Sequence, residues 1–229
     1  MSASRVRRSA TRRERRSQRE QAIVTAARTL LDERGWSDAP VQKIAHAAGM
    51  HKPDVYRTFD SKEEIFVLTL ADYLAELEGR SAAAREPKDP AAALRQACLR
   101  YVEFCLEYPA FMDCALSLMH RPADGLREQV SDAVWVRLGK AMAACVGRLE
   151  RILAAGAERG VFAIEDPTFT ANLLCTQMLG SMQLARIGAG VREVAPGVAA
   201  TFEVKPERVR DACVGDVLTA ARNPEGASA

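Results

Sequence analysis

The chain has 229 residues, of which 48% are hydrophobic and 27% are charged, a composition typical of a globular protein with one large or two small domains. Charged residues interrupt every long apolar stretch, so we expect no transmembrane span. No apolar run follows the basic N-terminus, so we expect no secretory signal. We therefore predict a cytoplasmic protein. Residues 1–20 carry eight Arg against two Glu, although the net charge of the whole chain is only +2. This concentration of positive charge predicts a polyanionic partner for the N-terminal end.

The N-terminal region divides into an arm and a helix. Residues 1–16 are rich in Arg, Ser and Ala without an apolar period, and we expect them to form a disordered basic arm. A helix is expected over residues 17–34, and Gly35 suits the position after its end. The apolar positions of this helix repeat at helical spacing: Ile23, Ala26, Ala27, Leu30 and Leu31.

Two short helical patterns separated by a glycine follow. The first is expected over residues 41–48, and Gly49 makes the turn because a left-handed backbone costs Gly least. The second is expected over residues 52–58, where Val55 and Phe59 can face a core and leave polar and basic residues outside. This pattern predicts a helix-turn-helix over residues 40–59, a motif whose second helix enters the major groove of DNA.

The rest of the chain continues with helical spacing. Ser61 and Glu64 form a capping-box pattern at the start of the next helix. Helices are expected at about 61–84, 91–107, 109–119, 124–159, 166–187 and 206–222. Residues 188–204 have no clear period and are expected to be a long loop, and residues 223–229 a tail. Because no alternation typical of strands is found, we predict an all-α fold of about nine helices: a three-helix DNA-binding domain followed by a helical body.

One spaced set of residues resembles the signature of TetR-family transcriptional regulators: Ile44, Ala45, Ala48, Gly49, Met50, Val55, Tyr56, Phe59, Ser61 and Lys62. The Gly35-Trp36 pair resembles the same family, and the likeness covers roughly residues 17–77. It implies a DNA-binding domain over residues 17–77 and a helical effector-binding and dimerisation domain over residues 78–222. The chain departs from the family pattern at Ala39, Pro40, His51, Pro53 and Asp54, so no operator sequence can be transferred.

The resemblance implies a homodimer that binds double-stranded DNA at a near-palindromic operator. The residues expected to contact DNA are Arg15, Arg16, Arg19, Gln42, His51, Lys52, Pro53, Asp54, Tyr56, Arg57, Thr58 and Lys62. Tyr56 and Lys62 are expected to meet phosphates, and Arg57 to read guanine because its guanidinium can contact O6 and N7 together. Asp54 either accepts a hydrogen bond from cytosine or caps the helix, and both interpretations stay open.

The resemblance further implies a repressor that a small molecule releases from its operator. The pocket candidates are aromatic or polarisable side chains: Tyr101, Phe104, Cys105, Phe111, Cys114, Trp135, Met142, Met178 and Met182. Few charges interrupt these helices, so a mainly hydrophobic effector is expected. The last two helices each carry a second apolar face, which gives the candidates for the dimer interface: Gly180, Leu184, Ile187, Val209, Cys213 and Val217.

Two alternative functions follow from other residue types. A thiol-based redox regulator on the same fold would use Cys98 and Cys105, spaced i, i+7, or Cys114. The cysteines occupy apolar positions without adjacent cations, which disfavours reactive thiols. An enzyme is disfavoured because the sequence has no G-x-S-x-G, no Gly-rich phosphate loop and no paired inward carboxylates. The three histidines lack metal-ligand spacing, so neither a metal nor another cofactor is expected.

Overall fold

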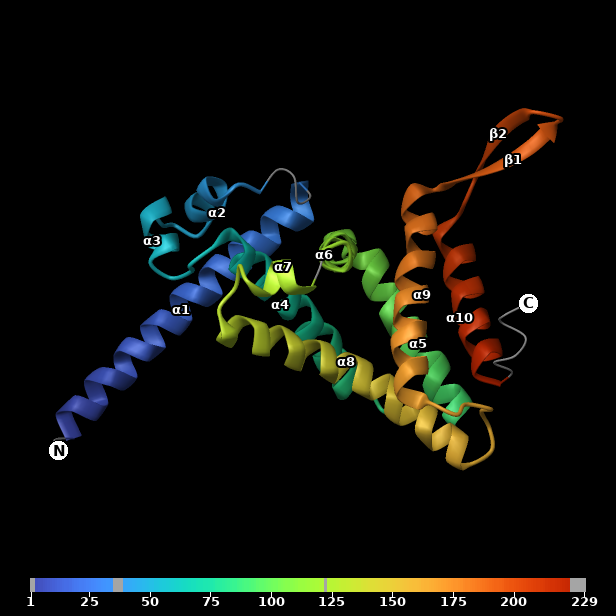
Figure 1. Ribbon diagram of the computed structural model, residues 1–229, viewed down its shortest axis with the longest axis horizontal. Helices are drawn as coiled ribbons and strands as arrows, with labels where there is room; N and C mark the ends of the chain where they lie inside the picture. Colours follow the sequence, from blue (N-terminus) through green and yellow to red (C-terminus); the bar gives the residue numbers. More distant parts are fainter. Residues whose placement is uncertain (1–2, 35–38, 122, 223–229) are drawn as a thin grey trace. The chain divides into compact units, whose positions relative to one another are not determined.

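The computed structural model describes residues 3–34, 39–121 and 123–222 (Figure 1). These ranges contain ten helices and one two-stranded sheet. The helices are α1 Ala3–Arg34, α2 Val41–Ala47, α3 Lys52–Tyr56, α4 Lys62–Ala83, α5 Pro90–Glu107, α6 Pro109–Met119, α7 Ala123–Arg127, α8 Asp132–Glu158, α9 Pro167–Ile187 and α10 Pro206–Arg222. The all-α prediction is therefore confirmed, with one small hairpin added. Among the described residues, no helix combines the length and apolarity needed to cross a membrane.

The chain forms two compact units. The first comprises the described residues within Met1–Tyr73 and Asp113–Ala141, and the second those within Leu74–Met112 and Met142–Ala229. Three helices, α4, α6 and α8, contribute residues to both units. The first unit contains the expected helix-turn-helix, and the second contains α5, α9 and α10, which pack on one another.

Helix α1 is longer than expected. The disorder predicted for residues 1–16 is wrong from Ala3 onward, because the structure continues α1 from Arg34 back to Ala3. No Gly or Pro interrupts this segment, and Arg, Ala, Gln and Glu are all strong helix formers. Once Ile23 and Leu31 are buried, each further residue extends the helix without a new nucleation cost. Gly35 and Trp36 lie outside the described residues.

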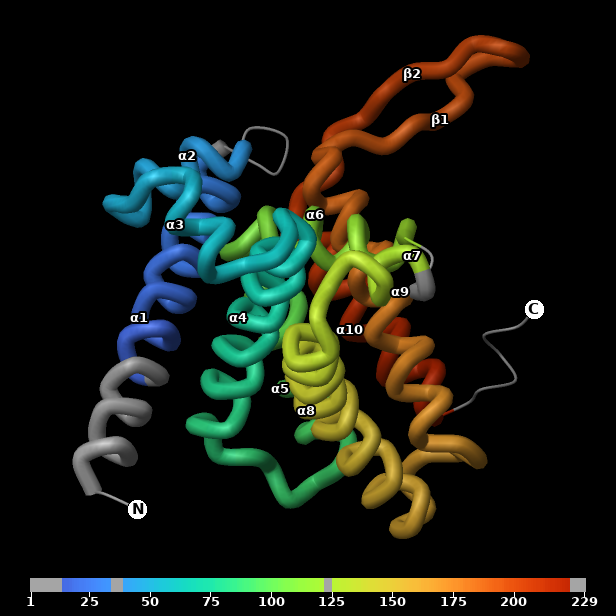
Figure 2. Tube along the Cα trace, turned by 60° about the vertical axis from the view of Figure 1, so that its left-hand side comes forward, coloured from blue at the N-terminus to red at the C-terminus, as the bar shows by residue number. Residues whose placement is uncertain are grey.

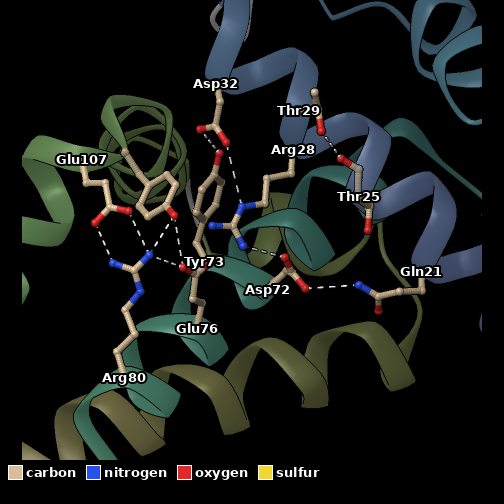
Figure 3. Close-up of polar contacts among 11 residues, drawn as sticks. Gln21, Thr25, Arg28, Thr29, Asp32, Asp72, Tyr73, Glu76, Arg80 and Glu107 are labelled. Atoms are coloured by element: carbon tan, nitrogen blue, oxygen red, sulfur yellow. Dashed lines mark hydrogen bonds and ion pairs between the residues drawn. The ribbon is translucent and has the colours of Figure 1, made fainter. Parts of the chain in front are cut away.

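Arg28 and Tyr73 fasten α1 to α4 within the first unit (Figure 3). Arg28 donates to Asp72 at 2.9 Å, and its guanidinium lies 4.2 Å from the centroid of the Tyr73 ring. The hydroxyl of Tyr73 donates to Asp32 at 2.5 Å. Burial, with Asp32 as the hydrogen-bond partner, raises the pKa of Tyr73 far above its usual value, so the phenol stays a neutral donor.

The single helix predicted over residues 124–159 is wrong, because α7 ends at Arg127 and α8 begins at Asp132. Side chains at the start of α4 form hydrogen bonds with the backbone of the residues between α7 and α8. The Ser61 hydroxyl donates to the carbonyl of Gln129 at 2.7 Å, and the N–H of Ser131 donates to the Glu64 carboxylate at 2.9 Å. These partners are distant in sequence, so local periodicity could not predict the break.

The long loop predicted over residues 188–204 is also wrong, as is the expected absence of strands. Strands β1 Ala189–Ala195 and β2 Val198–Glu203 pair antiparallel. Pro196 and Gly197 make the turn, and Gly197 has φ +76°, the left-handed conformation that a Gly after Pro supplies in a type II turn. The hairpin extends past the end of α9 in both views (Figures 1 and 2).

Candidate nucleic-acid interface

The scaffold of the helix-turn-helix lies where the sequence predicts it. Val41, Ile44, Val55 and Phe59 are all buried. Gly49 turns the chain between α2 and α3 with φ +67°, a backbone conformation that a residue with a Cβ rarely adopts. Because these apolar residues all face inward, the polar residues of α2 and α3 are left on the surface of the first unit.

The residues expected to contact DNA all lie on the surface of this unit. The exposed members of this set are Arg15, Arg16, Arg19, Gln42, His51, Lys52, Pro53, Tyr56 and Arg57. Asp54, Thr58 and Lys62 are partly exposed. The structure thus brings the members on α2 and α3 together at one surface, while the three arginines follow α1.

A surface groove of about 490 Å³ lies at the junction of α2 and α3. Its lining is formed by Leu30, Gln42, Lys43, Ala45, His46, Ala47, Met50, His51 and Lys52. Lys43 and His46 were not among the residues expected to contact DNA. Gln42 and Lys43 stand four and three positions before His46 on α2, and this spacing was the signal that both side chains lie beside that of His46. The groove therefore gathers side chains that can donate to phosphate oxygens.

Asp54 joins the start of α3 to Arg57. Its carboxylate accepts from the N–H of His51 at 3.3 Å and forms an ion pair with the Arg57 guanidinium, whose side chain is 71% exposed. The hydrogen bond from Arg57 is the main cause that holds the pKa of Asp54 below its usual value, and the bond from His51 adds to it. The helix cap, one of the two roles left open for Asp54, is thus present in the structure.

Tyr56 and Thr58 have different surroundings. The Tyr56 side chain is 45% exposed, and the ammonium of Lys52 lies 5.9 Å from its ring centroid, a separation at which cation and ring attract weakly. Thr58 donates its hydroxyl proton to the carbonyl of Asp54 at 3.1 Å. Tyr56 therefore presents a phenol at the surface, whereas the hydroxyl proton of Thr58 is already donated to the backbone of α3.

Replacing Asp54 by asparagine is expected to raise the affinity for random-sequence duplex DNA about 3- to 10-fold. Asn can still accept at the helix start, but the change removes a negative charge from the surface that is expected to meet phosphates and releases Arg57. Fluorescence anisotropy at several salt concentrations measures the effect. The matched control is Asp211→Asn, an exposed carboxylate on α10, and an Asp54→Asn affinity equal to that of the control would contradict the prediction.

One half of the predicted capping box forms at the turn between α3 and α4, while the Glu64 carboxylate reaches one residue further back than the pattern predicts, to Asp60. The N–H of Glu64 donates to the Ser61 hydroxyl at 3.1 Å, and the N–H of Asp60 donates to the Glu64 carboxylate at 2.9 Å. Glu64 is only 3% exposed. Burial alone would raise the pKa of Glu64, but the hydrogen bonds from Ser131 and Asp60 outweigh it and leave the pKa below its usual value. Glu64 is therefore a buried carboxylate that holds the end of the helix-turn-helix to the break before α8.

The second unit contains a small cavity of about 50 Å³. Its lining is formed by Leu77, Glu78, Ser81, Ala97, Cys98, Tyr101, Cys145, Arg148, Leu149, Cys175 and Met178. Among the predicted pocket residues, only Tyr101 and Met178 line it. Arg148 donates to Glu78 at 2.7 Å, so one part of the wall is an ion pair that the sequence did not reveal as a pocket element.

The other pocket candidates lie elsewhere. Phe104 and Phe111 pack together in the core of the second unit, with ring centroids 5.2 Å apart. Cys105 and Met182 are buried as well, and Met142 is 41% exposed. Cys114 and Trp135 belong to the first unit. Aromatic and sulfur-containing side chains thus mostly build the cores, which composition alone could not separate from a pocket wall.

The candidates for the dimer interface divide between two surroundings. Val209, Cys213 and Val217 are buried within the chain, because this side of α10 packs against α5 and α9. Their prediction as a surface for a partner is therefore wrong. Gly180, Leu184 and Ile187 are exposed, and they lie on the same α9 stripe as two further exposed apolar residues, Phe169 and Leu173.

The thiols of the chain lie in surroundings that disfavour the redox alternative. Burial raises the pKa of Cys105 and of Cys114 to about 12 and raises that of Cys98 further. The thiolate is the reactive form of cysteine, and it is scarce at neutral pH when the pKa is this high. The proposed thiol chemistry of these residues therefore lacks support from their environment.

Comparison with known proteins yields a family and a fold. Residues 23–68 match the family described as bacterial regulatory proteins, tetR family. No curated protein matches the chain. PfmR from Thermus thermophilus, a TetR-family transcriptional regulator, is a similar structure at 24% identity and TM-score 0.58, with 86% of this chain and 97% of that chain covered.

Two further structures share the fold. RolR, solved in complex with resorcinol, aligns at 20% identity and TM-score 0.61 over 91% of this chain and 93% of its own. HlyIIR, a hemolysin II transcriptional regulator, aligns at 17% identity and TM-score 0.53 over 91% of this chain and 99% of its own. The resemblance read from the helix-turn-helix is thus confirmed: residues 23–68 match the family described as bacterial regulatory proteins, tetR family, and the chain shares its fold with solved TetR-family transcriptional regulators.

Proposed function

We propose that this protein is a homodimeric, cytoplasmic repressor that a small molecule releases from a near-palindromic operator. The observation that carries the proposal is the surface of α2 and α3, where exposed donors and basic side chains overlie a buried apolar scaffold. In this proposal residues 17–77 bind DNA and residues 78–222 bind the effector and the second subunit. Residues 223–229, predicted to be a tail, lie outside the described part of the chain.

The proposed DNA contacts divide into phosphate and base contacts. Phosphates are bound by Tyr56 through its phenol, by Lys62 through its ammonium group, and by the polar and basic side chains of the α2–α3 groove. Arg57 reads a guanine, provided that it exchanges its pairing with Asp54 for the base edge. The exposure of Arg57 supports this role, because a side chain free of the core can turn from Asp54 to DNA at little cost.

The arginines of α1 are proposed to follow the DNA backbone. Replacing Arg15, Arg16 and Arg19 together by alanine is expected to weaken binding to all sequences and to reduce the slope of log K against log salt by roughly 0.9 per lost phosphate contact. Alanine keeps the helix, so the change removes charge and not structure. A titration from roughly 50 to roughly 200 mM salt measures the slope. An unchanged slope, equal to that of an Arg95→Ala control on α5, would remove these residues from the interface.

The exposed apolar stripe of α9 is the evidence for the proposed contact with a second subunit. Phe169, Leu173, Leu184 and Ile187 are between 43% and 67% exposed. Gly180 lies among them and would let a partner helix approach closely. Large apolar side chains gathered in the open on one helix face mark an interaction site, whereas such residues scattered singly do not.

The cavity of the second unit is the proposed effector site. Apolar side chains and thiols form most of its wall, and Tyr101, Ser81 and the Glu78–Arg148 pair supply polar groups. These groups favour a small molecule with an apolar body and one polar end. RolR was solved in complex with resorcinol, an aromatic ring that carries two hydroxyl groups. An engineered cavity that holds benzene measures roughly 150 Å³, so the cavity of about 50 Å³ must widen to accept a ring.

Binding of an effector is expected to lower the DNA affinity by roughly 5- to 150-fold, the usual range of allosteric coupling. A panel of small phenols beginning with resorcinol, tested for its effect on DNA binding, measures the response. Ala97→Leu fills the cavity and is expected to abolish the response, whereas Ala92→Leu, an exposed position on the same helix, leaves it unchanged. DNA affinity that no member of the panel moves would count against the proposed effector class.

A further inference from the structure

The β1–β2 hairpin projects from the second unit with both faces exposed. Every residue of Val191–Ala195 is exposed, and so is every residue of β2 except Ala200. Val191, Val194 and Val198 are 73%, 54% and 51% exposed. No described residue of the chain therefore covers these apolar side chains.

The hairpin has little internal packing of its own. Phe202 stacks on Gly190, where a Cβ would lie 2.3 Å from the ring. Val191 faces only Thr201 across the strands, and the base is closed by the N–H of Val204, which donates to Gly188 at 2.9 Å. An isolated two-stranded hairpin is at best marginally stable in water. A surface that packs on the hairpin would supply the missing stabilisation.

The charges and position of the hairpin identify the kind of surface. Arg192 is outnumbered by Glu193 and Glu203, so the hairpin does not attract a polyanion such as DNA. Its apolar residues continue the exposed stripe of α9, because Ile187 ends the helix one residue before Gly188 turns the chain into β1. A second copy of this chain presents the same stripe, and in a two-fold dimer a contact from the hairpin of one subunit to the stripe of the other is repeated in the opposite direction.

We propose that the hairpin is an arm that closes over the α9 stripe of the second subunit, and that each subunit does so in turn. This inference rests on the homodimer of the proposed function and adds the segment that fastens it. At about 3.4 Å per residue, the seven residues of β1 reach roughly 20 Å beyond α9. A helix with its side chains is about 10–12 Å wide, so the arm is long enough to cross one helix of the partner.

The test measures the dimer dissociation constant by sedimentation over a wide concentration range, with the full chain. One variant combines Val191→Thr, Val194→Thr and Val198→Thr, which keeps the β-branched shape but reduces the apolar surface. A second replaces residues 189–203 by a short Gly-Ser linker. The control is Val136→Thr, because Val136 on α8 is also about half exposed, at 52%. Circular dichroism checks that each variant is folded.

Both hairpin variants are expected to raise the dimer dissociation constant at least 10-fold, and the control to leave it unchanged. A dimer whose constant is the same in the wild type and in both variants overturns the arm but leaves the homodimer in place. A wild type that stays monomeric throughout overturns the arm and the homodimer together. Because DNA binding is measured separately, failure of the arm is distinguishable from failure of the regulator proposal.

Discussion

Replacing Glu64 by alanine is expected to lower the free energy of unfolding by about 3 kcal/mol, the largest effect on stability predicted for this chain. The carboxylate is 3% exposed and accepts from the N–H groups of Asp60 and Ser131, each at 2.9 Å. Alanine removes both hydrogen bonds, and a hydrogen bond to a charged group contributes about 1.5–3 kcal/mol. Urea unfolding, followed by circular dichroism, measures the difference.

The same carboxylate makes stability depend on pH. Its pKa is lowered in the folded protein, so its contribution is fully present above the unfolded value of about 4.3 and is lost as the pH falls through the folded value. Glu64→Gln keeps one acceptor oxygen and cannot titrate. We therefore expect Glu64→Gln to cost less than Glu64→Ala and to lose less stability than the wild type below about pH 4.3.

The neighbouring Glu63 provides the control for these variants, because it is only partly buried. Glu63→Ala is expected to change the free energy of unfolding by less than about 0.5 kcal/mol. If Glu64→Ala lowers the free energy of unfolding by no more than Glu63→Ala does, the break before α8 is held by other contacts.

Arg57→Ala is expected to weaken binding to the operator by about 1–3 kcal/mol, roughly 5- to 150-fold, and to relax specificity at one base pair. Arginine contacts guanine through two donors held in one plane, which alanine cannot replace and lysine replaces only as a point charge. Arg57→Lys is therefore expected to restore affinity for random DNA but not the base preference. Binding to a set of operators with single base changes measures both quantities.

The outcome at Arg57 separates two roles. If Arg57→Ala weakens binding to every sequence equally, the side chain contacts a phosphate and does not read a base. Arg95→Ala, which removes an exposed arginine on α5, controls for the loss of one positive charge.

The helix-turn-helix could be predicted because its signals are local. Val55 and Phe59 are one helical turn apart and both are buried, and Gly49 stands at the one position of the turn with positive φ. The start of α4 was equally predictable, since Ser61 and Glu64 form their capping contacts within four residues of one another. Patterns of this kind depend on neighbours in the sequence, and the fold preserves them.

The features that were mispredicted depend on distant partners. The break before α8 is satisfied by Ser61 and Glu64, more than sixty residues away, so the apolar period of α7 and α8 runs through it unaltered. Val217 is apolar on a second face of α10, and the sequence alone could not tell whether α5, α9 or another subunit covers that face. Gly197, which turns the hairpin, was a local signal of a turn. It was missed because the two strands on either side of it have no clear apolar period.

The most direct test of the central claim is selection of bound sequences from random duplex DNA by the purified wild-type chain. We expect a near-palindromic site to be enriched, with a dissociation constant of about 10⁻⁸ M or tighter at physiological salt and affinity that falls steeply as salt rises. Enrichment of no sequence, with equal affinity for all duplexes, would contradict the account of α2 and α3 as a sequence-reading surface.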